Sequence, residues 1–283
     1  MQLGIFAKTF ARPNFEDTFV VAKSLGVDCL QFNFSCAGLS TLPASIDHML
    51  LRRIRSELER CSLSMAAISG TCNLIHPDRT RRAKDVTKLQ LLIRSCRELG
   101  TSVVTLCTGS RDPADMWRPH PENHSVNAWR DLVKALEQLL PAAQEQNLVL
   151  GIEPEPSNVI DSAPRARMLL EQLKSPCLKI VFDAANLLES NTLDLQPRTL
   201  SEAFDLLGPD IIVAHAKDLT RDPRAGHVAA GRGALDYGLY LSLLHQTGFR
   251  GPLILHSLRE DEAAAAVAFL QDHLSRISSE RSL

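Results

Sequence analysis

The sequence predicts an α/β protein built as one closed (β/α)8 barrel, and three observations support this prediction. Eight short apolar runs recur along the 283 residues, amphipathic stretches of helical length separate them, and no change of composition divides the chain. Most of the runs are apolar at consecutive positions, which is typical of parallel strands covered on both faces. A barrel of this kind takes about 250 residues as one domain. We therefore expect a single barrel domain over residues 1–283, with a frayed polar tail at 278–283.

The elements can be placed along the chain in order. The expected strands are 2–7, 27–34, 63–69, 101–107, 148–153, 178–183, 211–216 and 252–257. The clearest expected helices are 15–25, 46–61, 86–99, 128–146 and 165–173. Glycines lie near helix ends just before the next strand, where a left-handed cap is favoured: Gly26, Gly100, Gly208 and Gly248. A doubly wound open sheet is the alternative, but eight regular units without a glycine-rich first turn disfavour it.

Composition and charge restrict the class of partner. The net charge is −2, with acidic and basic residues interspersed, so no footprint for nucleic acid or an anionic membrane appears. The seven cysteines are dispersed without a Cys-x-x-Cys pair, which favours reduced thiols in a cytosol. No window approaches the roughly 18 apolar residues of a membrane span, and the first residues do not form a signal peptide. We expect a soluble cytoplasmic protein; whether it forms a homo-oligomer is left open.

Four of the expected strands end in a side chain that can bind a metal ion: Glu153, Asp183, His215 and His256. Proline follows Glu153 and cannot donate to a sheet ladder, so the strand should end there. The carboxyl ends of barrel strands share one face, which is where barrel enzymes place their chemistry. Counting back by two from each residue reaches positions that suit a barrel interior, so the four side chains should point inward together.

Buried carboxylates so close to one another need a cation or protons. A single histidine on an apolar strand is more often a hydrogen-bonded core residue, but four such ends on consecutive strands favour a metal. We therefore predict one divalent ion held by all four side chains. Two carboxylates and two imidazoles suit Mn²⁺, Co²⁺, Fe²⁺ or Zn²⁺ better than Ca²⁺ or Mg²⁺.

Several short motifs give the chain a family resemblance. They are Ser69-Gly-Thr-Cys-Asn73 with His76-Pro-Asp78, Thr108-Gly-Ser-Arg111, Glu153-Pro-Glu155, Asp183-Ala-Ala-Asn186 and His215-Ala-Lys-Asp218. With these motifs the chain resembles the xylose-isomerase-like TIM barrels over essentially its whole length. That family comprises sugar phosphate isomerases and epimerases, with inosose dehydratase and hydroxypyruvate isomerase relatives.

The resemblance implies roles for individual residues. Glu153, Asp183 and His215 match three metal ligands, and Glu153 also matches a catalytic base. Arg221 matches a substrate-binding arginine, and Asn186 stands where relatives often have a substrate-binding histidine. His256 stands where relatives usually have a glutamate that is both the fourth ligand and the second base. His256 is therefore either a ligand or an acid/base group, and epimerisation with two bases is in question.

Further residues are candidates for contact with substrate. Lys217 shares the inward parity of His215 and suits stabilisation of an enolate oxygen, whereas Lys8 and Asn73 lie at the expected rim. Trp117 and His120 lie in the long connection 109–127, and connections of this length are commonly lids. Each has a structural alternative: rim solvation for Lys8, turn formation for Asn73, and anchoring of the connection for Trp117 and His120.

The resemblance implies a metal-dependent isomerase or epimerase of a small sugar, sugar phosphate or keto-polyol, acting through an enediolate with Glu153 as base. A keto-sugar lyase or dehydratase on the same metal site is the first alternative. A sugar-binding barrel without catalysis is the second. A DNA repair enzyme like endonuclease IV is the third, but the sequence shows neither the additional ligands nor a basic groove. The replacement at His256 favours chemistry on one face, isomerisation or elimination, over rapid epimerisation.

Overall fold

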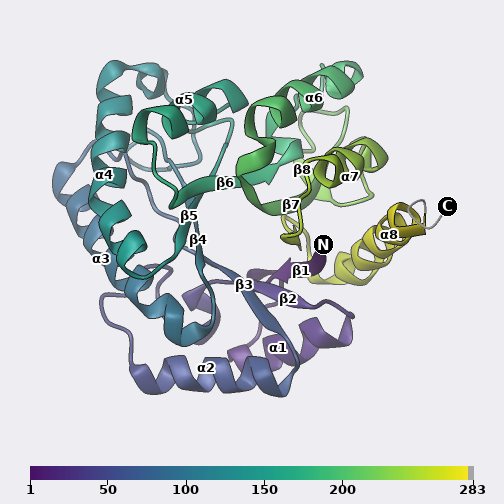
Figure 1. Ribbon diagram of the computed structural model, residues 1–283, viewed down its shortest axis with the longest axis horizontal. Helices are drawn as coiled ribbons and strands as arrows, with labels where there is room; N and C mark the ends of the chain where they lie inside the picture. The colour runs from purple at the N-terminus through teal and green to yellow at the C-terminus, as the bar shows by residue number, and fades with distance from the viewer. Residues whose placement is uncertain (280–283) are drawn as a thin grey trace.

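Over the residues that the structure describes, the protein is a closed barrel of eight parallel strands surrounded by eight helices (Figure 1). The structure, a computed structural model, describes residues 1–279, so most of the predicted tail at 278–283 lies outside the described residues. The barrel strands are β1 (Gln2–Phe6), β2 (Cys29–Phe32), β3 (Ser64–Ser69), β4 (Val103–Cys107), β5 (Val149–Glu153), β6 (Leu178–Asp183), β7 (Ile211–Leu219) and β9 (Pro252–Leu255).

Strand pairing decides between a barrel and an open sheet. From β1 to β7, each strand pairs in parallel with the next strand in the sequence. β9 then pairs in parallel with both β7 and β1. The ring is therefore closed, and the doubly wound alternative is excluded. One short strand, β8 (His227–Ala229), pairs antiparallel with the end of β7. Because of this pairing, β7 continues beyond its predicted end at 216.

The helices lie on the outside of the ring (Figure 1). They are α1 (Phe15–Ser24), α2 (His48–Arg60), α3 (Arg79–Leu99), α4 (Val126–Glu145), α5 (Ala163–Leu173), α6 (Gln196–Leu207), α7 (Tyr237–Gln246) and α8 (Glu260–Ser279). Short 3-10 turns are η1 (Ala7–Thr9), η2 (Phe34–Ala37), η3 (Pro121–His124), η4 (Ala184–Leu187), η5 (Leu193–Leu195) and η6 (Gly208–Asp210). None of the helices in the described part of the chain is long and apolar enough to cross a membrane.

The helix caps follow the predicted pattern at three of four glycines. Gly26, Gly100 and Gly248 have φ values of +80°, +78° and +76°, as a left-handed cap requires. The prediction is wrong at Gly208, which has a φ of −47° and begins η6. A Cβ at Gly208 would lie 2.5 Å from Cγ2 of Thr247, so this glycine permits close packing against the end of α7.

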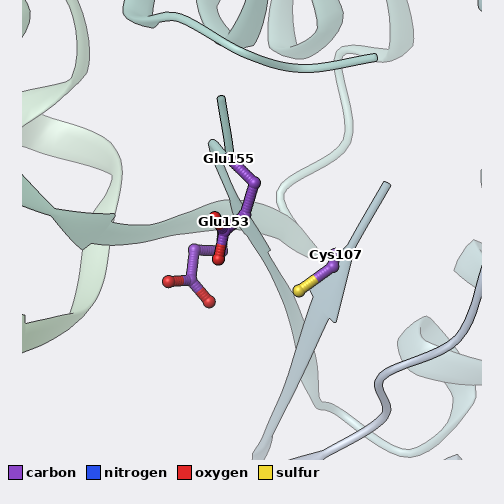
Figure 2. A group of neighbouring side chains, drawn as sticks. All are labelled: Cys107, Glu153 and Glu155. Carbon is purple, nitrogen blue, oxygen red and sulfur yellow. The ribbon is translucent and has the colours of Figure 1, made fainter. Parts of the chain in front are cut away.

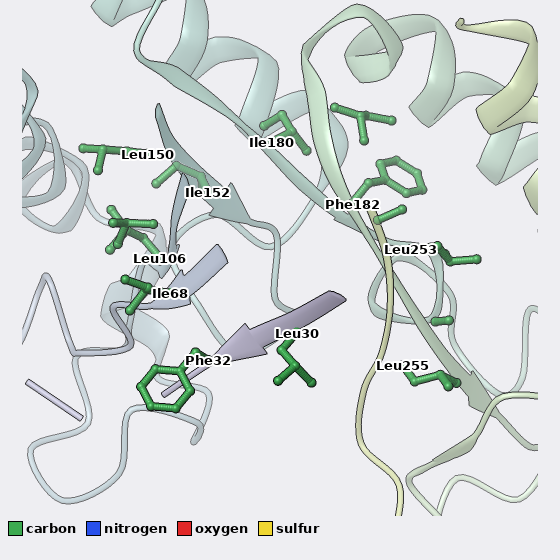
Figure 3. Close-up of a cluster of buried hydrophobic side chains, with 14 of the residues drawn as sticks. Leu30, Phe32, Ile68, Leu106, Leu150, Ile152, Ile180, Phe182, Leu253 and Leu255 are labelled. Atoms are coloured by element: carbon green, nitrogen blue, oxygen red, sulfur yellow. The ribbon is translucent and has the colours of Figure 1, made fainter. Parts of the chain in front are cut away.

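Two apolar layers fix the positions of the strands. The larger layer lies between strands and helices and contains side chains such as Leu30, Leu106 and Phe182 (Figure 3). The smaller layer fills the barrel interior with Cys29, Ala67, Val181, Val213 and Ile254. Val181, Val213 and Ile254 occupy the interior positions that the sequence predicted. Side chains two residues further along β6 and β7 therefore also point inward, at the carboxyl end of the barrel.

Space inside the barrel is limited just below that end. A Cβ at Gly151 would lie 2.7 Å from Cγ2 of Val181, so only glycine fits at this place on β5. The interior is thus closed beneath Glu153, and the residues above it face the open end of the barrel.

Candidate functional site

Three of the four predicted metal ligands meet at the carboxyl end of the barrel. Glu153 ends β5, Asp183 ends β6, and His215 lies in β7 opposite Asp183. One ligand atom from each residue lies within 4.8 Å of the other two, and all three side chains are buried. Nδ1 of His215 is 3.0 Å from Oε1 of Glu153 and 3.8 Å from Oδ2 of Asp183. The same ring nitrogen therefore faces both carboxylates.

The other nitrogen of His215 is held by a residue that the sequence analysis did not single out. Nε2 of His215 lies 2.9 Å from Oε1 of Gln31, a buried amide in β2. Without an ion, a proton on Nδ1 is donated to Glu153. With the proton on Nε2 donated to Gln31, Nδ1 would be free to bind an ion between the carboxylates, which is the usual support for a metal-binding imidazole. A signal for Gln31 existed in the sequence, because it is a polar residue two positions after the interior Cys29.

A buried lysine and an asparagine connect the carboxylates. Nζ of Lys217 is 3.2 Å from Oδ2 of Asp183 and donates to Oδ1 of Asn186 at 2.5 Å. Nδ2 of Asn186 in turn donates to Oε1 of Glu153 at 3.2 Å and to the carbonyl oxygen of Pro154 at 3.0 Å. The structure thus places both predicted substrate-binding residues, Asn186 and Lys217, beside the candidate ligands.

The charge of Lys217 and the neighbouring acids shape the ionisation of the site. Burial acts to lower the pKa of Lys217, but the charges of Asp183, Glu155 and Glu153 outweigh it and raise that pKa. Burial acts to raise the pKa of Glu153, yet the charge and hydrogen bond of His215 and the charge of Lys217 lower it to about 2. Glu153 is therefore a carboxylate, and Lys217 an ammonium, at neutral pH.

A third acid, Glu155, lies close to Glu153 and to the thiol of Cys107 (Figure 2). Burial and the charge of Glu153 raise the pKa of Glu155 to about 8. Burial also raises the pKa of the Cys107 thiol well above its ordinary value. Neither residue was assigned a role from the sequence, although Cys107 pairs with Glu153 across β4 and β5.

These residues fit a divalent cation. Three acidic side chains face one ammonium, and the fully buried Oδ2 of Asp183 has Nζ of Lys217 at 3.2 Å but no hydrogen bond of regular geometry in the described part of the chain. Burial raises the pKa of Asp183 despite the charge of Lys217, so a further positive charge would stabilise its ionised form. Carboxylate oxygens and an oriented imidazole nitrogen are donors for the first-row divalent ions.

His256 does not join this group. Its ring stacks on the ring of His215, with centroids 4.7 Å apart and planes 13° apart, and on Phe6 at 5.0 Å. Lone pairs of parallel stacked rings lie in separate planes, so His215 and His256 do not converge on one ion in this arrangement.

Strand pairing explains the position of His256. β9 ends at Leu255, His215 pairs with Ile254, and Ser257 turns the chain at a φ of +54°, so His256 lies one layer above His215. Its Nδ1 is 2.8 Å from Oγ of Ser257, and burial together with the charge of His215 lowers its pKa to about 3. His256 is therefore a neutral imidazole at neutral pH, and its role as ligand or as acid/base group stays a prediction.

The connection 109–127 forms part of the rim. Trp117 has 47% of its surface exposed and lines a cleft of about 390 Å³ together with Asn73 and His76. Nδ1 of His120 accepts a hydrogen bond from the Glu122 backbone N–H at 3.2 Å and so caps η3. Nδ2 of Asn73 donates to the Ser110 carbonyl oxygen at 2.7 Å, which ties the loop after β3 to the loop after β4. Contact of these three side chains with substrate stays a prediction.

Two predicted cationic residues lie at the surface. Lys8 is exposed in η1 after β1. Arg221 is exposed in the β7–β8 connection and donates to Oδ1 of Asp194 at 2.7 Å. Arg221 therefore pairs with a carboxylate at the surface, and the structure does not bring it together with Glu153 and Asp183 at the barrel mouth.

Comparison with known proteins identifies the family. The model of the xylose isomerase-like TIM barrel family matches residues 19–273. No curated protein matches the sequence. A solved L-ribulose 3-epimerase is 18% identical, with a TM-score of 0.78 over 99% of this chain and 97% of that chain.

Two further solved structures are similar. An IOLI protein with a bound zinc atom is 16% identical, with a TM-score of 0.74 over 99% of each chain. The probable 3-DHS dehydratase AsbF from Bacillus anthracis is 16% identical, with a TM-score of 0.74 over 96% of this chain and 99% of that chain. The family match covers most of the barrel, and these structures share its closed ring of strands. The chain therefore belongs to the xylose isomerase-like TIM barrel family.

Proposed function

We propose that this protein is a divalent-metal-dependent isomerase or epimerase of a small sugar, sugar phosphate or keto-polyol. The observation that carries the proposal is the buried meeting of Glu153, Asp183 and His215 beside the ammonium of Lys217, at the carboxyl end of the barrel. The similar structures support it, because one is an L-ribulose 3-epimerase and another holds zinc.

Glu153, Asp183 and Nδ1 of His215 would hold the ion, with Gln31 orienting the imidazole. When bound, such an ion polarises a substrate carbonyl and neutralises negative charge on neighbouring oxygens. The three ligands leave room for substrate oxygens, as a catalytic site requires. Mn²⁺, Co²⁺, Fe²⁺ and Zn²⁺ remain the ions that the donor set favours over Mg²⁺.

The chain's own residues would move the proton and stabilise charge. Glu153 is ionised at neutral pH and would accept the proton from the carbon next to the carbonyl, which leaves an enediolate. The Lys217 ammonium donates to the Asn186 amide, which donates in turn to Glu153, so both groups would lie ready beside the oxygen where negative charge develops. Burial of these groups strengthens their interaction with that oxygen.

A lyase or dehydratase acting on a keto-sugar is the second candidate. The same proton removal would be followed by cleavage of the C–O bond at the next carbon. A C=C bond would form between the two carbons, and the hydroxyl group would take up a proton and leave as water. The neutral imidazole of His256, in the place where family members usually carry a glutamate, favours this candidate over epimerisation with two carboxylates. A similar structure named as a probable dehydratase also supports it.

One experiment tests the proposal and separates the candidates. Protein of known metal content would be incubated in D₂O with a panel of aldoses, ketoses and inososes, and the products followed by ¹H NMR. Deuterium at one carbon of an isomeric product identifies an isomerase or epimerase, whereas an unsaturated or dehydrated product identifies a lyase. Metal binding without exchange or product on the whole panel would favour a sugar-binding barrel and contradict the proposal.

Substitution of the base provides the control. Glu153→Gln should lower the turnover number by about 10²–10⁴-fold, the usual contribution of a general base. Glu171→Gln, an exposed carboxylate on α5, should leave it unchanged. An unchanged rate in correctly folded Glu153→Gln protein would contradict the assigned role.

A further inference from the structure

A second polar cavity lies outside the barrel mouth, between the first turns of α3 and α4. It has a volume of about 620 Å³ and also contacts Arg111 from the loop after β4. Five of its lining residues are cationic: Arg79, Arg82, Arg111, Arg130 and Lys134. Only Glu122 and Asp131 among the lining residues carry a carboxylate. This cavity, the α3–α4 cleft, is therefore strongly positive in a protein whose net charge is −2.

The floor of the cleft is a fixed pair of guanidinium groups. Asp131 accepts from Nη2 of Arg111 at 2.7 Å and lies 3.1 Å from Nη2 of Arg82. Nη1 of Arg111 donates to the Ile75 carbonyl oxygen at 2.8 Å, and Nη1 of Arg82 donates to the His76 carbonyl oxygen. The side chains of Arg82 and Arg111 are 13% and 8% exposed, so the two planar groups are positioned before any ligand arrives.

The rim of the cleft carries three cations that form no ion pair with the described residues. Arg79, Arg130 and Lys134 are exposed, and no carboxylate of residues 1–279 lies within ion-pair distance of any of them. Burial lowers the pKa of Arg82, and the positive charges of Arg111 and Arg79 lower it further. Both α3 and α4 begin at this cleft, so the positive ends of two helix dipoles add to the field.

We propose that the α3–α4 cleft binds a phosphorylated small molecule through its phosphate group. A guanidinium presents parallel N–H donors that match phosphate oxygens, and three further cations can close around the remaining charge. The cavity volume lies within the range of about 300–1,000 Å³ that is usual for small ligands. The inference does not rest on the proposed reaction, because no lining residue belongs to the carboxylate and imidazole group of the barrel.

The shape and extent of the charge favour a small anion over a macromolecule. Nucleic acid binding needs a basic stripe or face, whereas these cations line one concave site in a protein of balanced charge. The bridge from Arg111 to Ile75 and Asp131 also joins the cleft to the loops after β3 and β4. A ligand bound there would stabilise loops that border the rim of the barrel.

The test compares two triple variants that lose the same number of charges. Arg79→Gln, Arg130→Gln and Lys134→Gln remove only exposed cations of the cleft, so the fold should be kept. The control, with Arg52→Gln, Arg94→Gln and Arg97→Gln, removes three exposed cations of α2 and α3 that do not line the cleft. Inorganic phosphate and pyrophosphate would be titrated into each protein by calorimetry, against sodium chloride and citrate at equal ionic strength.

We expect saturable phosphate binding by the unchanged protein and by the control, with pyrophosphate tighter. The cleft variant should bind phosphate at least about tenfold more weakly. Equal affinities in the two variants, or a response no larger than that to sodium chloride or citrate, would overturn the proposal. So would self-association that the cleft variant abolishes and phosphate leaves unchanged, since the cleft would then be an interface between copies. Circular dichroism on both variants confirms that they are compared as folded proteins.

Discussion

At the residue scale, the two histidines at the barrel mouth differ although their rings lie face to face. His215 directs Nδ1 at two carboxylates and is fixed by Gln31 on its other side, whereas His256 contacts Ser257, Phe6 and the face of His215. We therefore predict that His215→Gln abolishes stoichiometric binding of the divalent ion. His256→Gln should retain it within about tenfold in affinity, the lower end of the effect of residues around a ligand. Metal analysis after dialysis checks both values.

The comparison has a clear contrary outcome. If His256→Gln loses metal as completely as His215→Gln while both remain folded, the stacked arrangement is not the one that binds the ion. The four-ligand set expected from the sequence would then hold. Asn14→Ala, a change at the cap of α1, serves as a control for mild destabilisation without loss of a ligand.

Sequence alone could indicate some of these residues and not others. Glu153, Asp183 and His215 end or lie in apolar runs and share an inward parity, so their meeting follows from the period of a strand. Gln31 has no such mark except its polarity inside an apolar run. The stacking of His256 depends on where β9 ends and on the turn at Ser257, which tertiary packing decides. The alternation of side chains along a strand therefore predicts whether a residue points into the barrel, but not how high it lies along the barrel axis.

At the scale of elements, one buried carboxylate organises the segment between β7 and α7. Asp218 accepts hydrogen bonds from the backbone N–H groups of Leu219, Gly231, Gly233 and Leu235, at 2.9 to 3.1 Å. Asp218→Ala would remove the acceptor of all four groups, and those of Leu219 and Leu235 belong to buried residues. We predict that it lowers the free energy of unfolding by at least about 3 kcal/mol, measured by urea denaturation.

A nearby aspartate provides the matched control. Asp222 lies in the same connection but is half exposed, so Asp222→Ala should change stability by no more than about 0.5 kcal/mol. Equal losses in the two variants would show that the segment tolerates the absence of Asp218.

A second element-scale prediction concerns acid stability at the opposite end of the barrel. Asp210, before β7, accepts from Lys179 of β6 at 2.5 Å and from Arg167 of α5 at 2.9 Å. Burial acts to raise its pKa, but the two cations outweigh burial and lower the pKa below the ordinary value of 3.8. A carboxyl with a lowered pKa stabilises the fold above its ordinary pKa, and this contribution is lost as the pH falls below that value.

The wild-type protein should therefore exceed Asp210→Asn in stability by about 1–2 kcal/mol at pH 6–8. The difference should shrink as the pH falls below 3.8. Denaturation curves of both proteins across this range provide the measurement. A difference that stays constant down to pH 3 would show that the ion pair is not its source.

The elements themselves were well indicated by the sequence, and the errors have local causes. The predicted strand at 211–216 continues to Leu219 because β8 folds back on it, a pairing that no apolar run announced. Gly208 was expected to cap a helix, but close packing against Thr247 is what requires a glycine there. Both errors arise from contacts between segments, which propensity and period do not encode.

At the scale of the whole molecule, the barrel places carboxylates from the neighbouring strands β5 and β6 at one end and concentrates negative charge there. Removal of a bound ion would leave Glu153, Asp183 and Glu155 facing only Lys217. With the ion at a hundred times its Kd, binding adds about 2.7 kcal/mol to the free energy of unfolding. We predict that complete removal by chelation lowers the Tm by about 4–5 °C, measured by calorimetry and restored by adding metal.

The variant His215→Gln supplies the internal comparison. Its Tm should be insensitive to chelation, because it lacks the imidazole ligand. Loss of metal from the unchanged protein without a change in Tm would show that the ion is not coupled to the fold.

The closed ring itself was predicted from the number and regularity of the apolar runs, and the β1–β9 and β6–β7 pairings confirm it. What the sequence could not reveal is the polar cavity between α3 and α4. Its five cations are spread over α3, α4 and the loop after β4, so only the folded molecule brings them into one place.

The stacked rings of Phe6, His256 and His215 give the site an intrinsic spectroscopic label. Protons held over the face of an aromatic ring resonate upfield of their usual position, and His256 is enclosed between two such faces. Its imidazole signals should therefore stand apart from those of the exposed histidines in a proton spectrum. Any rotation of His215 would alter the stack and move those signals, so occupancy of the barrel mouth could be followed without attaching a probe.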